Sequence, residues 1–323
     1  MTRRHTLPFC VMREHIRIAN AALLALLLAG CATAVPVPPA DSIRVMTFNI
    51  RLDLASDGDN AWPHRKDAVA SMIRFHGADL VGLQEALPEQ LRDLDALLPD
   101  FSRFGAGRGA DRLGEHCAIL YRRDRFELLA HDTFWLSETP EVPGSKGWDA
   151  AYERIVTWGR LRDRRSDEVF LHVNTHLDNV GSEARREGAR LLLRRVDGVA
   201  GSDRTGVAIV VTGDFNDTPR SEPWLLMTAG GFDDALDRSL CPHHGPASTW
   251  NGFTAIEAGR RIDFVFVRGD VAVLQHAVLS DTFDAHRFPS DHLPVIAELR
   301  IGASRHGVRS RCVEAAHGAS SVP

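Results

Sequence analysis

The sequence has no charge run, no internal repeat and no low-complexity linker that would divide its 323 residues. Its composition, with 44% hydrophobic and 25% charged residues, is that of an ordinary globular protein. No G-x-S-x-G motif is present, which disfavours a serine hydrolase. We therefore expect one catalytic domain over residues 43–301, followed by a flexible tail over residues 302–323.

Cysteine is scarce, with five in the whole chain and no C-x-x-C pair. This pattern argues against a structural zinc site. Cys117 lies in an apolar run and is predicted to be a small buried core residue. In an oxidising compartment, Cys241 and Cys312 could form a disulfide bridge.

The apolar run near the N-terminus, residues 21–29, is too short to span a bilayer, and basic residues precede it. Leu28-Ala29-Gly30-Cys31 then resembles a bacterial lipobox, in which the cysteine is lipidated and becomes the first mature residue. We expect a lipoprotein signal peptide over residues 1–31 and an extended tether over residues 32–42. The alternative is an ordinary secretory signal cut near Ala34. Both place the mature protein outside the cytoplasm.

Outside the predicted signal peptide, negative charges outnumber positive charges. The chain carries a net charge of -5, and its first thirty residues hold four Arg and one Glu, so the remainder carries -8. Non-specific binding to nucleic acid depends mainly on cations that neutralise phosphates. We therefore expect no stable nucleic-acid partner.

Apolar patterns predict about ten strands and few helices. The predicted helices cover residues 64–76, 89–98 and 182–199. The predicted strands cover residues 43–50, 78–83, 117–121, 126–134, 155–161, 169–175, 207–212, 262–267, 271–279 and 293–301. Continuous apolar runs such as 208–212 are typical of strands covered on both faces. Two sheets packed together with helices outside fit this pattern better than a single doubly wound sheet.

Polar side chains follow many of these apolar runs, where a sheet would deliver them to one rim. The set comprises Asn49, Glu85, His176, Asp178, Asp214, Asn216, Asp263, Asp291 and His292. Cleavage of a phosphate ester needs the phosphate charge masked and the leaving oxygen stabilised. Hard divalent cations do both, and they prefer carboxylate and amide oxygens. His292 adds a group that titrates near neutral pH.

Each motif has a simpler interpretation when taken alone. Asp214 and Asn216 could belong to a polar turn, and Asp263 could form a surface ion pair with Arg260 or Arg261. His172 and His176, four residues apart, could suggest zinc, but oxygen ligands dominate the set and favour Mg²⁺. The loop at Asp214 is not an EF-hand, because Pro219 fills the glycine position.

Together the motifs resemble the endonuclease/exonuclease/phosphatase superfamily, the deoxyribonuclease I-like group, over residues 43–301. Residues 134–158 further resemble a small bacterial exported branch of it. This resemblance implies a four-layered α/β sandwich, with two mixed β-sheets packed face to face and helices outside. It also implies that Asn49, Glu85 and Asp291 hold Mg²⁺, with Mn²⁺ as a possible substitute.

The same resemblance assigns roles to the remaining residues. His176 would contact the scissile phosphate, Asp214 and Asn216 would orient the nucleophile and the phosphate, and Asp263 would hold His292. Motif matching leaves open whether Asp214, the His292 pair or the metal activates the water. Arg154 falls where the family places a phosphate-binding arginine, although it could instead be an ion-paired residue at a strand entry. Asp178 is expected to help bind the substrate.

The leading hypothesis is an exported, Mg²⁺-dependent phosphoric ester hydrolase, monomeric and anchored in the membrane by lipid at Cys31. A nuclease acting on DNA or RNA is the second hypothesis, and Arg162, Arg164 and Arg165 form the compact basic cluster it would need. A catalytically inactive binding lipoprotein is the third. The substrate is expected to be a small phosphate ester, because the mature chain is acidic.

Overall fold

Two six-stranded sheets form the centre of the computed structural model, which describes residues 41–201, 207–284 and 286–302. The described residues belong to one compact unit. The predicted signal peptide, Cys31, Cys312 and the tail beyond Gly302 lie outside them, as does all of the predicted tether except its last two residues.

The first sheet has the strand order β11-β12-β1-β2-β4-β3. Its strands are β1 (Ile43–Asn49), β2 (Leu80–Gln84), β3 (Phe101–Phe104), β4 (Ile119–Arg122), β11 (Val271–Val278) and β12 (Val295–Ile301). Only β1 and β2 run parallel within this sheet, and the other paired strands are antiparallel.

The second sheet has the order β5-β6-β7-β8-β10-β9. Its strands are β5 (Phe126–Trp135), β6 (Ile155–Asp163), β7 (Val169–His176), β8 (Ala208–Asp214), β9 (Asp233–Asp234) and β10 (Asp263–Arg268). Here β7 and β8 form the parallel pair. Each sheet is therefore mixed, with its parallel pair near the middle.

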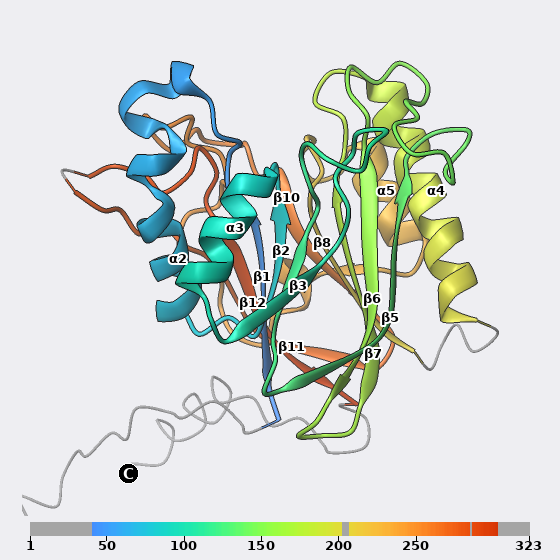
Figure 1. Cartoon of the computed structure of the whole chain (residues 1–323). Coiled ribbons are helices and arrows are strands. Elements are labelled where there is room, and N and C mark those ends of the chain that lie inside the picture. Colours follow the sequence, from blue (N-terminus) through green and yellow to red (C-terminus); the bar gives the residue numbers. More distant parts are fainter. Residues whose placement is uncertain (1–40, 202–206, 285, 303–323) are drawn as a thin grey trace, which may run out of the picture. The chain divides into compact units, whose positions relative to one another are not determined.

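The two sheets pack face to face, and helices cover their outer faces (Figure 1). Val45 and Leu80 of the first sheet share a core with Phe170 and Val265 of the second. The helices are α2 (Lys66–Phe75) and α3 (Pro88–Leu97) on the first sheet, and α4 (Ser182–Ala200) and α5 (Glu222–Ala229) on the second. The shorter elements are η1 (Ala55–Asn60), η2 (Trp62–His64) and α6 (Ala235–Arg238). The predicted four-layered sandwich is confirmed.

A buried polar seam joins the sheets beneath the rim where the strands end. Gln84 Nε2 donates to Asn174 Oδ1 at 2.7 Å, and the Asn174 amide donates to the Leu83 carbonyl at 2.8 Å. Gly82 allows this close approach, because a Cβ there would lie 2.1 Å from Thr212 Oγ1. The seam fixes the spacing of the sheets and therefore of the side chains at the rim.

The thirteen predicted strands and helices are present, and their ends differ from the prediction by at most two residues. Strand β3 and helix α5 were not predicted from the sequence. Helix α5 begins after Ser221 and has Pro223 in its first turn, but it is only eight residues long and shows no clear apolar stripe. Cys117 is buried and free, as predicted, and Cys241 is disulfide-bonded. Among the described residues, no helix has both the length and the apolar content needed to cross a membrane.

Candidate active site

The polar residues predicted from the sequence converge on one rim of the two sheets, which is uppermost in Figure 1. His176, Asp214 and Asp263 lie side by side, because β7, β8 and β10 place them in register across three adjacent strands. Asn49 ends β1, and Glu85 follows β2 with a positive φ of 62°. Such a backbone conformation is uncommon outside glycine and is found where neighbouring structure holds it in place.

Asn49 links the two sheets at this rim. Its buried Nδ2 donates to Glu85 Oε1 and to Asp214 Oδ2, each at 3.0 Å. Its Oδ1 accepts the Arg51 backbone N–H at 3.0 Å, and the Leu52 N–H donates to Glu85 Oε2 at 3.1 Å. The metal residue expected on β1 and the catalytic carboxylate expected on β8 are thus in direct contact.

His292 is held by two carboxylates. Its Nδ1 lies 2.9 Å from Asp263 Oδ2, and its Nε2 lies 3.7 Å from Asp214 Oδ2. Burial disfavours the cation, but the charges of Asp263 and Asp214 outweigh it and raise the pKa of His292 to about 10. The ring of Trp250 meets the His292 ring edge-on, with centroids 4.8 Å apart. The two carboxylates therefore favour the imidazolium form of His292, and the contact with Asp263 fixes its orientation.

Asp214 lies at the centre of the cluster. Burial, followed by the charge of Asp263, raises the pKa of Asp214 to about 7. Asp214 Oδ1 accepts the Asn216 backbone N–H at 2.8 Å, and Oδ2 lies 3.4 Å from His176 Nε2. Its two oxygens thus contact Asn49, His176 and Asn216, and its Oδ2 lies near His292.

His176 is neutral in this environment, because burial and then the charge of Arg154 hold its pKa well below the usual range. Its Nε2 lies 2.9 Å from Asn216 Nδ2. A neutral ring whose Nε2 accepts a hydrogen bond places its proton on Nδ1. Asn216 has a φ of 50°, which matches the tight turn after β8.

Two groups of side chains can be tested as a site for a divalent cation. Asp214, Asp263 and His292 offer ligand atoms that all lie within 4.8 Å of one another. A histidine ligates a metal only when it is unprotonated, and His292 is held between two carboxylates that favour its protonated form. This group therefore fits a metal less well than a hydrogen-bonded catalytic cluster.

Glu85 and Asp291 form the second group. Burial and then the charge of Glu85 act to raise the pKa of Asp291, so these carboxylates repel one another in a buried setting that a cation would relieve. Carboxylate oxygens suit Mg²⁺. Asn49 could join them once its amide rotates to present its oxygen in place of Nδ2. The oxygen donors present thus fit a hard divalent cation.

Arg154 and Asp178 form a supporting layer. Asp178 Oδ2 accepts Arg154 Nε at 3.2 Å, and Asp178 also accepts backbone N–H groups from Ala151, Tyr152, Val180 and Gly181. Asp178 is 2% exposed. The structure therefore places Asp178 behind Arg154, where it positions the guanidinium.

Several residues outside the predicted site also build this rim. Arg65 is fully buried and donates to the carbonyls of Ile50, Arg51 and Asn60. Thr249 Oγ1 accepts the backbone N–H of Asp263 at 3.2 Å. These contacts join loops that are far apart in the sequence, so no local sequence pattern predicts them.

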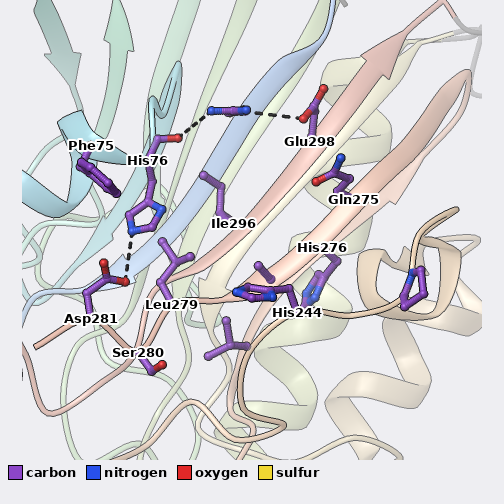
Figure 2. A pocket seen from close by; sticks show the side chains of 14 residues that line it. Phe75, His76, His244, Gln275, His276, Leu279, Ser280, Asp281, Ile296 and Glu298 are labelled. Atoms are coloured by element: carbon purple, nitrogen blue, oxygen red, sulfur yellow. Dashed lines mark hydrogen bonds and ion pairs between the residues drawn. The ribbon is translucent and has the colours of Figure 1, made fainter. Parts of the chain in front are cut away.

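A cavity of about 450 Å³ lies elsewhere, on the outer face of β11 and β12 (Figure 2). Phe75, His76, His244 and Glu298 are among its lining residues. No residue of the predicted site lines it. The zinc alternative also finds no support at His172, whose Nε2 lies 3.0 Å from Thr212 Oγ1 inside the sandwich.

Comparison with known proteins gives a consistent result. The model of the endonuclease/exonuclease/phosphatase family matches residues 46–292. An endonuclease/exonuclease/phosphatase from Bacteroides vulgatus is 38% identical with a TM-score of 0.76, over 80% of this chain and 99% of that one. The mannosyl-6-phosphatase Bt3783 of Bacteroides thetaiotaomicron is 33% identical with a TM-score of 0.75, over 80% and 99% of the two chains.

Curated proteins are more distant. Nocturnin of Drosophila melanogaster is 24% identical over an alignment that covers 81% of this chain and 47% of Nocturnin. The chain spans less than two thirds of the length of the curated relatives that it matches.

Proposed function

Because the chain belongs to the endonuclease/exonuclease/phosphatase family, whose members include phosphoester hydrolases, we propose that it is a Mg²⁺-dependent hydrolase of small phosphate esters. The observation that carries the proposal is the convergence of Asn49, Glu85, Asp214 and His292 on one rim, within a connected polar network. Mn²⁺ would be able to replace Mg²⁺, since both accept oxygen ligands.

In this proposal the chain's own residues orient the reactants. Asn216 and His176, 2.9 Å apart, bind the phosphoryl oxygens from one side. Asp214 accepts a hydrogen bond from the attacking water and aims it at phosphorus. His292, held by Asp263, donates to an oxygen on which negative charge develops. A divalent cation held by Glu85 and Asp291 would neutralise phosphoryl charge and stabilise the leaving oxygen.

A small substrate is favoured over a polynucleotide by the placement of basic residues. Arg162 and Arg164, two of the three residues in the predicted basic cluster, lie near the far end of β6 from Arg154, and both pair with Glu127. They are therefore remote from the rim and partly neutralised. The name of the Bacteroides thetaiotaomicron relative, a mannosyl-6-phosphatase, is consistent with a sugar phosphate as substrate.

We place the activity outside the cytoplasm, on a membrane, through a lipid at Cys31. This part of the proposal depends on the basic residues, the short apolar run and the lipobox-like residues 28–31. A monomer is expected.

The test is a panel of phosphate esters, including sugar phosphates, phospholipids, duplex DNA and RNA, assayed with Mg²⁺, Mn²⁺ and EDTA. Turnover of small esters that EDTA abolishes is the expected result. Strongly salt-sensitive cleavage of DNA, without turnover of small esters, would favour the nuclease. No turnover of any substrate with either metal would favour the inactive binding protein.

A further inference from the structure

A narrow slot of about 10 Å³ opens beside the proposed phosphate position. Its lining residues include Glu85 and His176 of the candidate site, the guanidinium groups of Arg108 and Arg154, and the carboxylates of Glu115 and Glu153. A cavity of this size holds about one water molecule, or one oxygen atom of a ligand. It is too small for an oxygen that carries a carbon substituent.

Arg108 is fixed before any ligand arrives. Its Nη1 donates to Glu115 Oε2 at 2.9 Å, and its Nη2 lies 2.6 Å from Glu115 Oε1. Its backbone N–H donates to the Glu115 carbonyl at 2.9 Å, and its own carbonyl accepts Trp135 Nε1 at 2.6 Å. A guanidinium held in this way loses little conformational entropy when it binds an anion.

Arg154 is held with similar rigidity. Its Nε and Nη2 donate to Asp178 and Asn179 at 3.2 and 3.0 Å. Both guanidinium groups also lie over the ring of Tyr152, at 5.0 Å for Arg108 and 5.8 Å for Arg154. Arg108 Nε and Arg154 Nη1 have no hydrogen-bond partner within the described part of the chain. Each arginine therefore keeps one donor for a ligand.

The charges of both arginines reach the catalytic residues. The charges of Arg108 and Arg154 both lower the pKa of His176, and both also lower the pKa of Glu115. The slot thus joins the site where the scissile phosphate would be held, and it offers N–H donors to an additional oxygen.

We propose that Arg108 and Arg154 form a receptor for the third unesterified oxygen of a phosphate monoester, so that the enzyme prefers monoesters to diesters. This inference rests on the proposed function. A monoester has three non-bridging oxygens, whereas a diester has two and carries a carbon group on the oxygen that would enter the slot. Size and charge therefore select in the same direction, because the monoester dianion gains more from two guanidinium groups.

The test compares p-nitrophenyl phosphate with bis-p-nitrophenyl phosphate, which share a leaving group, at saturating Mg²⁺. We expect the wild type to favour the monoester in kcat/KM. Arg108→Gln should lower the ratio of monoester to diester kcat/KM by about 10- to 100-fold, the usual effect of one charge-assisted hydrogen bond. Equal losses on both substrates, or a wild type that favours the diester, would overturn the proposal.

Two further variants separate recognition from folding. Arg108→Gln leaves Glu115, with a side chain 13% exposed, without its ion-pair partner. The double variant Arg108→Gln/Glu115→Gln removes that unpaired charge and should show the same altered ratio. Arg162→Gln removes an equal charge from the far end of β6, where the side chain is 42% exposed, and should leave the ratio unchanged.

Binding of inorganic phosphate, measured by calorimetry against diethyl phosphate, provides a readout independent of turnover. If neither of these esters nor any substrate of the panel is hydrolysed, the proposed function fails. The slot would still be supported if phosphate binds more tightly than diethyl phosphate and weakens about 10-fold or more in Arg108→Gln but not in Arg162→Gln. Equal binding of the two anions would overturn it.

Discussion

His292 and Asp263 form a fixed pair, with Nδ1 of the imidazole 2.9 Å from Oδ2 of the carboxylate. Asp263 lies opposite Asp214 in the ladder between β10 and β8, so the pair is held by the sheet and not by a loop alone. The other Asp263 oxygen, Oδ1, is buried and has no hydrogen-bond partner among the described residues. Such an unpaired buried oxygen is costly and is typical of a site built for function.

The first prediction concerns this pair. His292→Ala should lower kcat by roughly a hundred- to ten-thousand-fold, because general acid–base groups contribute about that much. Asp263→Ala should resemble it, since the carboxylate orients and charges the ring. The double variant should lose little more than either single variant. Steady-state kinetics and circular dichroism on all three would check this, and fully additive losses would show that the residues act separately.

The second prediction concerns acid stability. Burial lowers the pKa of His172 to about 3, whereas an unfolded histidine titrates near 6.5. Between these values the unfolded chain binds more protons than the folded one, so the free energy of unfolding falls as pH falls, by at most about 1.4 kcal/mol per pH unit from this group.

His172→Gln should therefore flatten the acid side of the stability profile between about pH 6.5 and 3. Urea unfolding at a series of pH values would measure it. His131→Gln, at an exposed position on β5, serves as the control. If wild type and His172→Gln fell in parallel, His172 would not be the group that titrates.

The sequence was most informative where a polar residue directly follows a buried strand. Asn49, His176 and Asp214 could be placed on a common rim because strand direction alone delivers them there. The ends of the elements differ from the prediction by at most two residues, because hydrophobicity changes gradually at the end of a strand and does not define its last residue.

Sequence patterns were least informative for residues that long-range contacts bring to the site. Arg108 reaches the slot because a tight loop pairs it with Glu115, and Gly107 permits that loop since a Cβ there would lie 2.3 Å from the Leu113 carbonyl. The function of Asp178 likewise depends on Arg154, which is 24 residues away in the chain. The hydrophobic periodicity of the sequence does not predict such long-range side-chain pairs.

The third prediction tests the cation site. Glu85→Gln keeps the size of the side chain but removes the charge that would hold a hard cation. Most activity should be lost, and the Mg²⁺ concentration for half-maximal activity should rise. Titration of Mg²⁺ against activity measures this, with Glu89→Gln on α3 as the control. Unchanged activity at sub-saturating Mg²⁺ would exclude Glu85 as a principal ligand.

The fourth prediction concerns Asp178. Its Oδ1 accepts three backbone N–H groups, and its Oδ2 accepts a fourth together with Arg154 Nε. In Asp178→Asn, whichever way the amide turns, an NH₂ group faces N–H donors. The free energy of unfolding should fall by about 2–4 kcal/mol, as expected when buried charge-assisted hydrogen bonds are lost.

Arg154 should also lose its position in Asp178→Asn, so that KM for the phosphate ester rises in the protein that remains folded. The control is Asp217→Asn, which breaks the more exposed ion pair with Arg185 and should cost about 1 kcal/mol or less. Denaturant unfolding, together with measurement of KM, would distinguish Asp178→Asn from Asp217→Asn. If the free energy of unfolding fell by the expected amount while KM stayed unchanged, Asp178 would have a structural role only.

The last prediction concerns the membrane anchor. If Cys31 carries the lipid, the wild type should sediment with membranes and be released by detergent, because several acyl chains together anchor stably where a single chain binds only weakly. Cys31→Ser should appear in the soluble extracytoplasmic fraction or remain unprocessed. Cys10→Ser, within the predicted signal peptide, should behave as wild type, because that segment is removed whichever residue it contains. A soluble wild-type protein whose first residue lies after Cys31 would reject lipidation and favour the ordinary secretory signal cut near Ala34.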